Sequence, residues 1–295
     1  MNLQHNVPIG PLTTYRVGGP AALFAVIDTE DDLVTAVDLV RSERMPVLVV
    51  GKGSNLLVAD AGFDGLAITL GDGFGDVVID GTTVAAGGAA SLPVVARRTA
   101  SAGLTGFEWA VGVPGSIGGA VRMNAGGHGS DMAATLTRVR VVDLASGDDG
   151  WIATDALDLA YRHSAIGPAQ VVVRAELHLG HGHVAGAEAT IGSIVRWRRA
   201  NQPGGQNAGS VFTNPLDDSA GRLIDAAGCR GLRHGTAVVS DKHANFFIAD
   251  EGGRADDVVA LMYEVRQRVH DVHGIWLEPE TRLIGFPNPR LEVEG

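Results

Sequence analysis

Ser210 is the side chain whose surroundings point most directly to chemistry. It lies in the run Asn207-Ala-Gly-Ser-Val-Phe-Thr-Asn-Pro215, where Gly209 permits a close backbone approach and a polar turn follows. A serine hydroxyl acts as a nucleophile or as an acid–base group when its neighbours fix its rotamer. The run has neither the Gly-x-Ser-x-Gly elbow nor the Ser-x-x-Lys pair of acyl-transfer enzymes, so acyl transfer has no support. A loop serine without chemistry remains the alternative at this point.

Two glycine-rich loops are the second candidate for chemistry. The first, Val50–Val58, reads VGKGSNLLV, and the second covers residues 112–129. Neither matches the phosphate-binding loop of nucleoside triphosphatases, and neither has the Gly-x-Gly-x-x-Gly that opens a dinucleotide-binding helix. Exposed main-chain N–H groups in such loops form anion-binding concavities that suit a diphosphate. Two loops in one chain therefore predict a cofactor cradle made from main chain.

A mixed set of helices and strands must position these loops. Apolar spacing, caps and breakers predict helices over 29–44, 91–102, 187–200, 218 or 219 to 227, and 254–273. Apolar runs predict strands over 47–50, 65–70, 77–79, 83–86, 139–144, 171–177 and 275–284. Asp80-Gly81 is a strong hairpin turn between two of them. The class is α+β, and the break at Gly180–Gly186 is the expected domain boundary.

Composition narrows the classes of partner. The net charge is −11 (23 Lys and Arg against 34 Asp and Glu), which argues against nucleic acid. Cys229 is the single cysteine, so no internal disulfide forms, as expected in a reducing compartment. The start has no signal-peptide pattern and no apolar run is long enough for membrane insertion, so we expect a cytoplasmic protein. His181 and His183 lack further ligands at metal-binding spacing, so we expect no metal.

The ordered set of motifs resembles a known family. The glycine loops and Thr14-Tyr-Arg-Val-Gly-Gly-Pro-Ala21 resemble the FAD-binding fold of vanillyl-alcohol oxidase and related flavoenzymes. More narrowly, the chain resembles the UDP-N-acetylenolpyruvoylglucosamine reductase family in its shorter, type II form. This likeness includes Tyr161-Arg-His-Ser164, Asn207–Pro215, Val239-Ser-Asp-Lys-His-Ala-Asn-Phe246 and Leu277-Glu-Pro-Glu-Thr-Arg-Leu-Ile-Gly285. It runs from about residue 10 to 285.

The resemblance implies a fold, a reaction and its partners. It implies an FAD-binding domain of the PCMH type over 1–180, with subdomains at about 1–60 and 61–180, and a substrate-binding domain over 186–295. It implies that NADPH reduces non-covalent FAD, which then reduces the enolpyruvyl group of a UDP-sugar in peptidoglycan precursor synthesis. The oligomeric state does not follow from the sequence, and a monomer is the favoured expectation.

The resemblance also assigns roles to residues. Ser210 matches the proton donor, Arg162 the arginine that binds the substrate carboxylate, and Glu280 the glutamate of the final strand. Glu278 would share a strand face with Glu280, and the family pattern favours Glu280. The substrate residues are Asn214, Tyr161 and either Arg198 or Arg199. The cofactor-binding residues are Gly51, Lys52, Gly53, Ser54, Asn55, Leu56, Gly112, Pro114, Gly115, Ser116, Gly118, Gly119, Arg122 and Asn124.

The chain departs from the family pattern at a few positions, and two other functions stay open. Thr213 stands where the family usually has Lys, Val238 where it has Gln, and Cys229 where Leu is common. A flavin oxidase of the same fold would commonly link a His or Cys to the flavin, and His128 is the nearest candidate. A non-catalytic flavin- or nucleotide-binding protein is the third possibility, and Thr213 and Val238 favour it.

Overall fold

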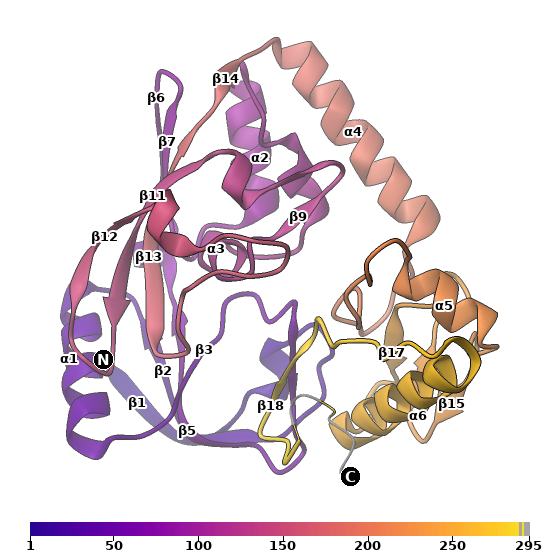
Figure 1. Cartoon of the computed structure of the whole chain (residues 1–295). Helices are drawn as coiled ribbons and strands as arrows, with labels where there is room; N and C mark the ends of the chain where they lie inside the picture. Colours follow the sequence, from indigo (N-terminus) through magenta and orange to yellow (C-terminus); the bar gives the residue numbers. More distant parts are fainter. Residues whose placement is uncertain (289–290, 292–295) are drawn as a thin grey trace. The chain divides into compact units, whose positions relative to one another are not determined.

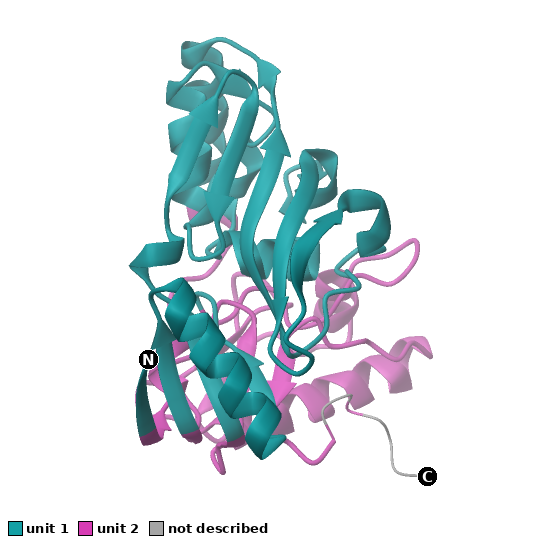
Figure 2. Cartoon of the chain, turned by 90° about the vertical axis from the view of Figure 1, so that its left-hand side faces the viewer, with its two compact units in different colours: residues 1–4, 23–52, 65–198 teal, residues 5–22, 53–64, 199–295 magenta. Residues whose placement is uncertain are grey.

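The chain forms two compact units, each built from separate stretches of sequence (Figure 2). The computed structural model describes residues 1–288 and Leu291. Unit 1 comprises residues 1–4, 23–52 and 65–198, and unit 2 comprises residues 5–22, 53–64 and 199–295. Figure 1 shows the elements in chain order. The boundary expected at 180–186 remains a prediction.

The described residues contain six longer helices, several short 3-10 turns and many short strands. The helices are α1 (Glu30–Glu43), α2 (Leu92–Ser101), α3 (Ile117–Met123), α4 (Val184–Asn201), α5 (Ala220–Ala226) and α6 (Ala255–His273). The 3-10 turns are Gly10–Leu12, Asp72–Phe74, Glu108–Gly112, Met132–Ala134 and Thr154–Leu157. The strands are β1 (Asn2–Pro8), β2 (Pro20–Ile27), β3 (Val47–Val49), β4 (Leu56–Val58), β5 (Phe63–Leu70), β6 (Val77–Asp80), β7 (Thr83–Gly87), β8 (Leu104–Thr105), β9 (Gly126–Gly127), β10 (Ser130–Asp131), β11 (Leu136–Asp143), β12 (Asp149–Ala153), β13 (Gln170–His178), β14 (Gly180–His181), β15 (Arg233–His234), β16 (Ala237–Val239), β17 (Phe247–Ala249) and β18 (Arg282–Ile284).

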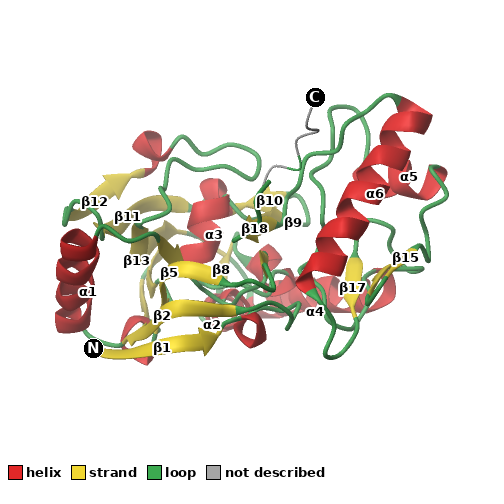
Figure 3. Ribbon diagram, turned by 90° about the horizontal axis from the view of Figure 1, so that it is seen from below, coloured by secondary structure: helices red, strands yellow, loops and turns green. Residues whose placement is uncertain are grey.

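An antiparallel five-stranded sheet, in the order β12-β11-β13-β7-β6, is the frame of unit 1. Both faces of β13 are covered, since Val171 and Val173 pack with α1 while Val172 and Leu177 pack with the cluster that holds α2 and α3. Side chains of a strand alternate between faces, so the continuous apolar run of β13 fits a strand buried on both sides. Figure 3 shows α1 beside β11 and β13. A second sheet, in the order β1-β2-β5-β3, contributes Ile27 and Ile68 to the α1 cluster.

In unit 2, α6 packs against a small antiparallel sheet, β15-β16-β17, and α5 packs against α6. Its core gathers apolar residues from distant parts of the chain, including Tyr15, Leu57, Phe212, Phe247 and Met262. In the same unit β4 pairs in parallel with β18, so that Leu57 lies opposite Leu283. The segment that follows the first glycine-rich loop is therefore joined to the segment that follows Glu280.

Glycines at positions 18 and 19 explain part of the Thr14–Ala21 motif. Gly18 has φ of +116°, and a Cβ there would lie 2.2 Å from the carbonyl oxygen of Val58. A Cβ at Gly19 would lie 2.3 Å from the carbonyl oxygen of Asp60. No side chain fits such an approach of two main chains, so the motif serves packing at these two positions.

Most predicted elements are confirmed, and the final strand is wrong in its extent. The helices occur at their expected places, Ser219 caps α5, and the Asp80-Gly81 hairpin joins β6 to β7. The strand expected over 275–284 exists only as β18, so Glu280 precedes the strand instead of lying in it. The N–H groups of Glu280 and Thr281 both point to one carbonyl oxygen, that of Val211, and Pro279 has no N–H, so no ladder forms there. The strands β1 and β2 were not predicted, because their sequences lack a clean alternation.

Among the described residues, no helix is both long and apolar enough to span a membrane.

Candidate active site

Ser210 occupies a loop of unit 2 whose backbone is fixed immediately on either side of it. Gly209 has φ of +80°, a conformation that favours glycine, and its N–H donates to Oδ1 of Asn207 at 3.1 Å. The N–H of Val211 donates to the carbonyl oxygen of Asn245 at 2.9 Å. Ser210 itself is half-buried. The backbone around Ser210 is therefore held by hydrogen bonds, while the residue itself stays partly accessible.

Glu280 lies beside the Ser210 loop because the two backbones pair. The N–H of Glu280 donates to the carbonyl oxygen of Val211 at 2.8 Å, and Phe212 and Pro279 form an antiparallel bridge. The structure thus brings together two of the three residues expected to be catalytic, with Glu280 opposite the residue that follows Ser210. The side-chain amide of Asn55 donates to the carbonyl oxygen of Glu280 at 3.0 Å, which ties this pair to the first glycine-rich loop.

The environments of Glu278 and Glu280 differ. The side chain of Glu278 is 67% exposed, and its Oε1 lies 3.8 Å from Nη2 of the buried Arg266. Glu280 is half-buried, next to the fully enclosed Thr281. A carboxyl group that acts on a substrate must be screened from bulk water, and Glu280 meets this condition better than Glu278.

Arg162 and Tyr161 form the tip of a tight hairpin in unit 1. Ala160 and His163 close the hairpin with N–H to carbonyl bonds of 3.2 and 3.1 Å. Arg162 has φ of +57°, a strained conformation for a residue with a side chain. Its Nη2 donates to the carbonyl oxygen of Gly126 at 3.3 Å, and its guanidinium lies 5.0 Å from the centre of the Tyr161 ring. The arginine is thus aimed by its own turn and by the neighbouring aromatic ring.

Asn124 supports this hairpin from the end of α3. It ends the helix with φ of +37°, and its side chain is buried. Its Nδ2 donates to the carbonyl oxygen of Ala160 at 3.0 Å, and its Oδ1 accepts from the N–H of Ala133 at 2.9 Å. These bonds occupy the carboxamide, so the side chain of Asn124 has a structural task here.

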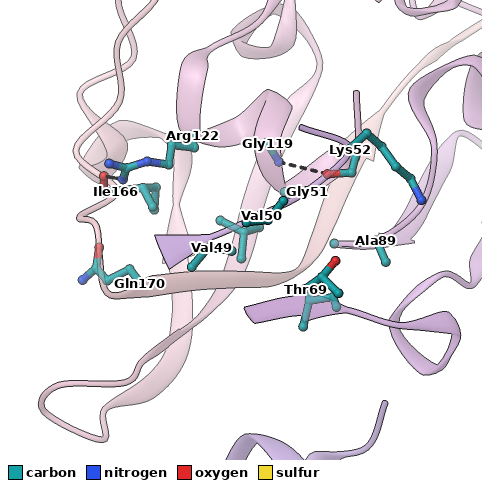
Figure 4. A pocket seen from close by; sticks show the side chains of 15 residues that line it. Val49, Val50, Gly51, Lys52, Thr69, Ala89, Gly119, Arg122, Ile166 and Gln170 are labelled. Carbon is teal, nitrogen blue, oxygen red and sulfur yellow. Dashed lines mark hydrogen bonds between the residues drawn. The ribbon is translucent and has the colours of Figure 1, made fainter. Parts of the chain in front are cut away.

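A pocket in unit 1 collects much of the expected cofactor site (Figure 4). It is lined by apolar side chains, several glycines and polar groups, namely Val49, Val50, Gly51, Lys52, Thr69, Leu70, Gly88, Ala89, Ser116, Gly118, Gly119, Arg122, Ile166, Gln170 and Val172. Figure 4 shows Arg122 and Lys52 at opposite ends of this pocket. Nη1 of Arg122 donates to the carbonyl oxygens of Ile166 and of Gly167, the latter at 2.7 Å.

Glycines make room for the main chains that line this pocket. A Cβ at Gly88 would lie 2.0 Å from the carbonyl oxygen of Val172, and one at Gly118 would lie 3.1 Å from the same atom. A Cβ at Gly51 would lie 2.7 Å from Oγ of Ser116. At Gly88 the main chain of β13 therefore leaves no space for a side chain, and at Gly51 the space is taken by the Ser116 hydroxyl.

Some of the cofactor-binding residues predicted from the sequence line this pocket in unit 1. The expected residues that line the pocket are Gly51, Lys52, Ser116, Gly118, Gly119 and Arg122, and those outside its lining are Gly53, Ser54, Asn55, Leu56, Gly112, Pro114, Gly115 and Asn124. The lining that was missed comes mainly from β3, β5 and β13 and from the two residues that follow β7. The glycine pair Gly87-Gly88 at the end of β7 was an available signal, because a strand seldom ends in two glycines without a close approach.

The second half of the first loop belongs to unit 2. Gly53 has φ of +61°, and a Cβ there would lie 2.2 Å from the carbonyl oxygen of Leu12. Its own carbonyl accepts from the N–H of Thr14 at 3.1 Å, and the carbonyl of Asn55 accepts from the N–H of Arg282 at 3.0 Å. This half of the loop is therefore held by the Thr14–Ala21 motif and by the segment after Glu280.

The expected substrate residues are distributed over both units. Asn214, in unit 2, is exposed, and its Oδ1 accepts from the N–H of Ala220 at the start of α5. Tyr161 is 58% exposed in unit 1. Arg198 is half-buried on α4, and burial lowers the pKa of its guanidinium. Arg199, the alternative, is exposed, and its carbonyl oxygen accepts from Nζ of Lys242 at 2.7 Å.

The histidines considered in the sequence have different surroundings. The ring of His128 meets that of Trp197 edge-on at 5.1 Å, and burial, followed by the charge of Arg198, lowers its pKa. His181 lies in β14, opposite Leu104. Among residues 1–288 and Leu291, no group of three or more His, Cys, Asp or Glu side chains is arranged to hold a metal ion.

The departures from the family pattern have local explanations in two cases. Oγ1 of Thr213 lies 3.3 Å from the carbonyl oxygen of Glu278, which also accepts from the Thr213 N–H at 2.9 Å. Cys229 is fully buried in the unit 2 core, where burial raises the pKa of its thiol, so it serves as an apolar filler. Val238 is a half-buried residue of β16, and nothing in the structure explains its replacement of Gln.

Comparisons with known proteins cover nearly the whole chain. A family model for an FAD binding domain matches residues 21–148, and one for the C-terminal domain of UDP-N-acetylenolpyruvoylglucosamine reductase matches residues 201–284. The UDP-N-acetylenolpyruvoylglucosamine reductase of Granulibacter bethesdensis is 43% identical over 99% of this chain and 94% of its own length. That of Heliobacterium modesticaldum is also 43% identical, over 98% of this chain and 92% of its own length. The crystal structure of the reductase from Thermus caldophilus superposes with a TM-score of 0.84 at 34% identity, covering 96% of this chain and 99% of that one.

The pocket leads to a test at Gly88. We expect Gly88→Ala to weaken FAD binding at least about tenfold, because its methyl group would push β13 away at Val172; tenfold corresponds to about 1.4 kcal/mol. FAD content after purification and titration of the apoprotein measure the change. Gly150→Ala on β12 is the matched control, since a Cβ there meets nothing within 4 Å. Equal FAD affinity in both variants would refute the proposed pocket.

Proposed function

The chain belongs to the UDP-N-acetylenolpyruvoylglucosamine reductase family, and from this premise we propose how its residues divide the reaction. It is an FAD-dependent oxidoreductase of peptidoglycan synthesis that uses NADPH to reduce the enolpyruvyl group of its UDP-sugar substrate. One hydride and one proton add across the vinyl double bond, and NADPH is oxidised to NADP⁺. The proposal rests on the bond between the Glu280 N–H and the Val211 carbonyl, which keeps Ser210 and Glu280 side by side.

The pocket of unit 1 fits FAD in its chemistry. Its apolar walls, such as Val50 and Val172, suit a planar ring system, and the cations Lys52 and Arg122 lie at its two ends, where either one could bind a pyrophosphate. Gly51 adds no side chain to the lining, so a bound group can come close to its main chain. FAD, when bound, accepts a hydride from NADPH and passes it to the vinyl carbon. We propose that these residues and the loop through Leu56 hold it without a covalent bond.

Ser210 is proposed as the proton donor. Addition of a hydride to the terminal vinyl carbon leaves negative charge on the neighbouring carbon, which is conjugated with the carboxylate. That carbon is strongly basic, so a hydroxyl can protonate it without a lowered pKa. The fixed backbone on either side of Ser210 supports the role, because a proton donor must keep its position relative to the reacting carbon.

Arg162 is proposed as the cation that binds the substrate carboxylate. Its planar guanidinium can pair with both carboxylate oxygens while charge builds up on them. The strained hairpin and the stacked Tyr161 fix its direction in advance. Glu280 supplies the polar partner that stabilises the enol form of the same group.

The sugar nucleotide is proposed to contact Asn214, Tyr161 and Arg198 or Arg199. Thr213 and Val238 replace a Lys and a Gln of the family pattern, so this chain has one cation and one amide fewer for these contacts. The change concerns how the substrate is bound, since neither residue carries a step of the reaction.

We also propose that the enzyme acts in the cytoplasm as a monomer and does not bind nucleic acid. Its substrates are small anionic nucleotides, and its net charge of −11 repels a phosphate backbone. Light scattering should give a mass near 30.5 kDa, and twice that value would contradict the monomer.

The role of Ser210 is tested by separating the two halves of the reaction. Without oxygen, NADPH should bleach the flavin of Ser210→Ala at the wild-type rate, because Ser210 takes no part in that step. Reoxidation by the enolpyruvyl substrate should be about 10²–10⁴-fold slower, the usual contribution of a general acid. Stopped-flow absorbance measures both rates. Equal slowing of the two halves would refute the donor role.

Arg162→Lys tests the carboxylate contact. We expect reoxidation by the substrate to slow by about 10²-fold, since an ammonium cannot make the bidentate contact of a guanidinium. Arg138→Lys is the matched control, because Arg138 makes a bidentate pair with Glu176 on the surface of the same unit. If the two variants react at the same rate, Arg162 is not the carboxylate ligand.

A further inference from the structure

Asn245 is a buried polar residue to which the reaction as described above gives no role. It lies in unit 2, between the turn at Ser240 and β17, and is 2% exposed. Burial of a carboxamide is unfavourable unless all of its hydrogen-bonding groups find partners, so its bonds indicate what it does. Those bonds go to the loop of Ser210.

The carboxamide of Asn245 binds both polar groups of the Phe212 backbone. Its Oδ1 accepts from the Phe212 N–H at 3.0 Å, and its Nδ2 donates to the Phe212 carbonyl oxygen at 2.8 Å. The side chain thus reproduces the pair of bonds that a neighbouring strand would make. Its own carbonyl also accepts from the Val211 N–H at 2.9 Å.

The remaining backbone group of this dipeptide binds the segment of Glu280. The Val211 carbonyl accepts from the N–H of Glu280 at 2.8 Å and from that of Thr281 at 3.3 Å. All four backbone groups of Val211 and Phe212 are therefore bonded, three to Asn245 and one to the segment of Glu280. The dipeptide connects Asn245 to both residues proposed for the reaction.

Asn245 is itself fixed by the turn that precedes it. Its N–H donates to Nδ1 of His243 at 3.3 Å, and Oγ of Ser240 accepts from the N–H groups of Lys242 and His243. Burial lowers the pKa of His243, which suits a neutral ring whose Nδ1 accepts a hydrogen bond. The carboxamide is thus attached to a rigid support and not to a mobile loop.

We propose that Asn245 is a positioning residue of the reductase, which sets the place of the Ser210 hydroxyl relative to Glu280 through the Val211–Phe212 dipeptide. This rests on the roles proposed above for Ser210 and Glu280. Asn245 does not touch the substrate in this proposal. It acts by holding the backbone that carries the proton donor, and a displacement of about 1 Å is enough to slow a positioned group about 10²-fold.

Asn245→Asp is the sharpest variant. The carboxylate keeps the shape of the side chain and the acceptor for the Phe212 N–H, but an oxygen replaces the Nδ2 donor and faces the Phe212 carbonyl oxygen. Two acceptors repel each other, so the dipeptide should move or lose order while the core keeps its volume. Asn245→Ala removes both side-chain bonds and gives a second, uncharged test.

The experiment compares the half-reactions and the local backbone protection. We expect Asn245→Asp and Asn245→Ala to slow reoxidation by the substrate at least tenfold and to leave bleaching by NADPH within about twofold of wild type. Hydrogen exchange of peptides covering Gly209–Thr213 and Glu278–Thr281 should become faster in both variants. Val258→Ala in the core of the same unit is the control, since it destabilises unit 2 without removing any of the dipeptide hydrogen bonds described above.

The outcomes separate this proposal from the one on which it rests. If the Asn245 variants slow both half-reactions as the Val258→Ala variant does, or leave exchange of the two peptides unchanged, Asn245 is merely structural. In that case Ser210→Ala still slows reoxidation selectively and the donor role stands. If Ser210→Ala has no selective effect on reoxidation, the donor role is wrong. The positioning role then fails with it, even if hydrogen exchange becomes faster in the Asn245 variants.

Discussion

The hydrogen bond from the Glu280 N–H to the Val211 carbonyl is the contact on which the proposed chemistry of unit 2 depends. It joins two segments 69 residues apart in the sequence, and neither segment is part of a regular sheet at that point. A single hydrogen bond contributes only about 1 kcal/mol of net stability, so this contact needs support from both sides. Asn245 supplies that support at the dipeptide, and Asn55 supplies it at Glu280.

The cofactor pocket of unit 1 depends on a different constraint, which is the close approach of main chains at glycine. β13 is covered on both faces, so its backbone cannot move away from Gly88 and Gly118 without loss of packing in two hydrophobic clusters. The pocket is therefore formed before the cofactor arrives. A rigid, pre-formed site spares the protein the entropic cost of ordering loops on binding.

The sequence predicted what is local and missed what depends on distant pairing. The predicted helices were correctly placed, because caps and breakers leave marks in a few consecutive residues. The second glycine-rich loop was not, since it contains α3 (Ile117–Met123), which was not predicted. Gly88 and Gln170 were not predicted for the pocket, since their meeting requires the pairing of β7 with β13. The strand predicted over 275–284 was too long, again because its extent depends on pairing with a distant segment. Its alternating pattern was real, but the partner segment forms a single antiparallel bridge, between Phe212 and Pro279, instead of a ladder.

A protein of net charge −11 repels an anionic nucleotide at long range, so binding depends on the charges close to the site. Exposed charges further apart than about 8–10 Å are largely screened at physiological salt, so the charges close to a site decide its potential. Many of the carboxylates are paired on the surface, as in the contacts of Arg140 with Glu30 and Asp149. Arg122, which lines the cofactor pocket, donates to the carbonyl oxygen of Gly167, a contact that orients its guanidinium. Replacing Lys by Thr at position 213 then removes one cation from the substrate contacts, while the cations at the cofactor pocket stay in place.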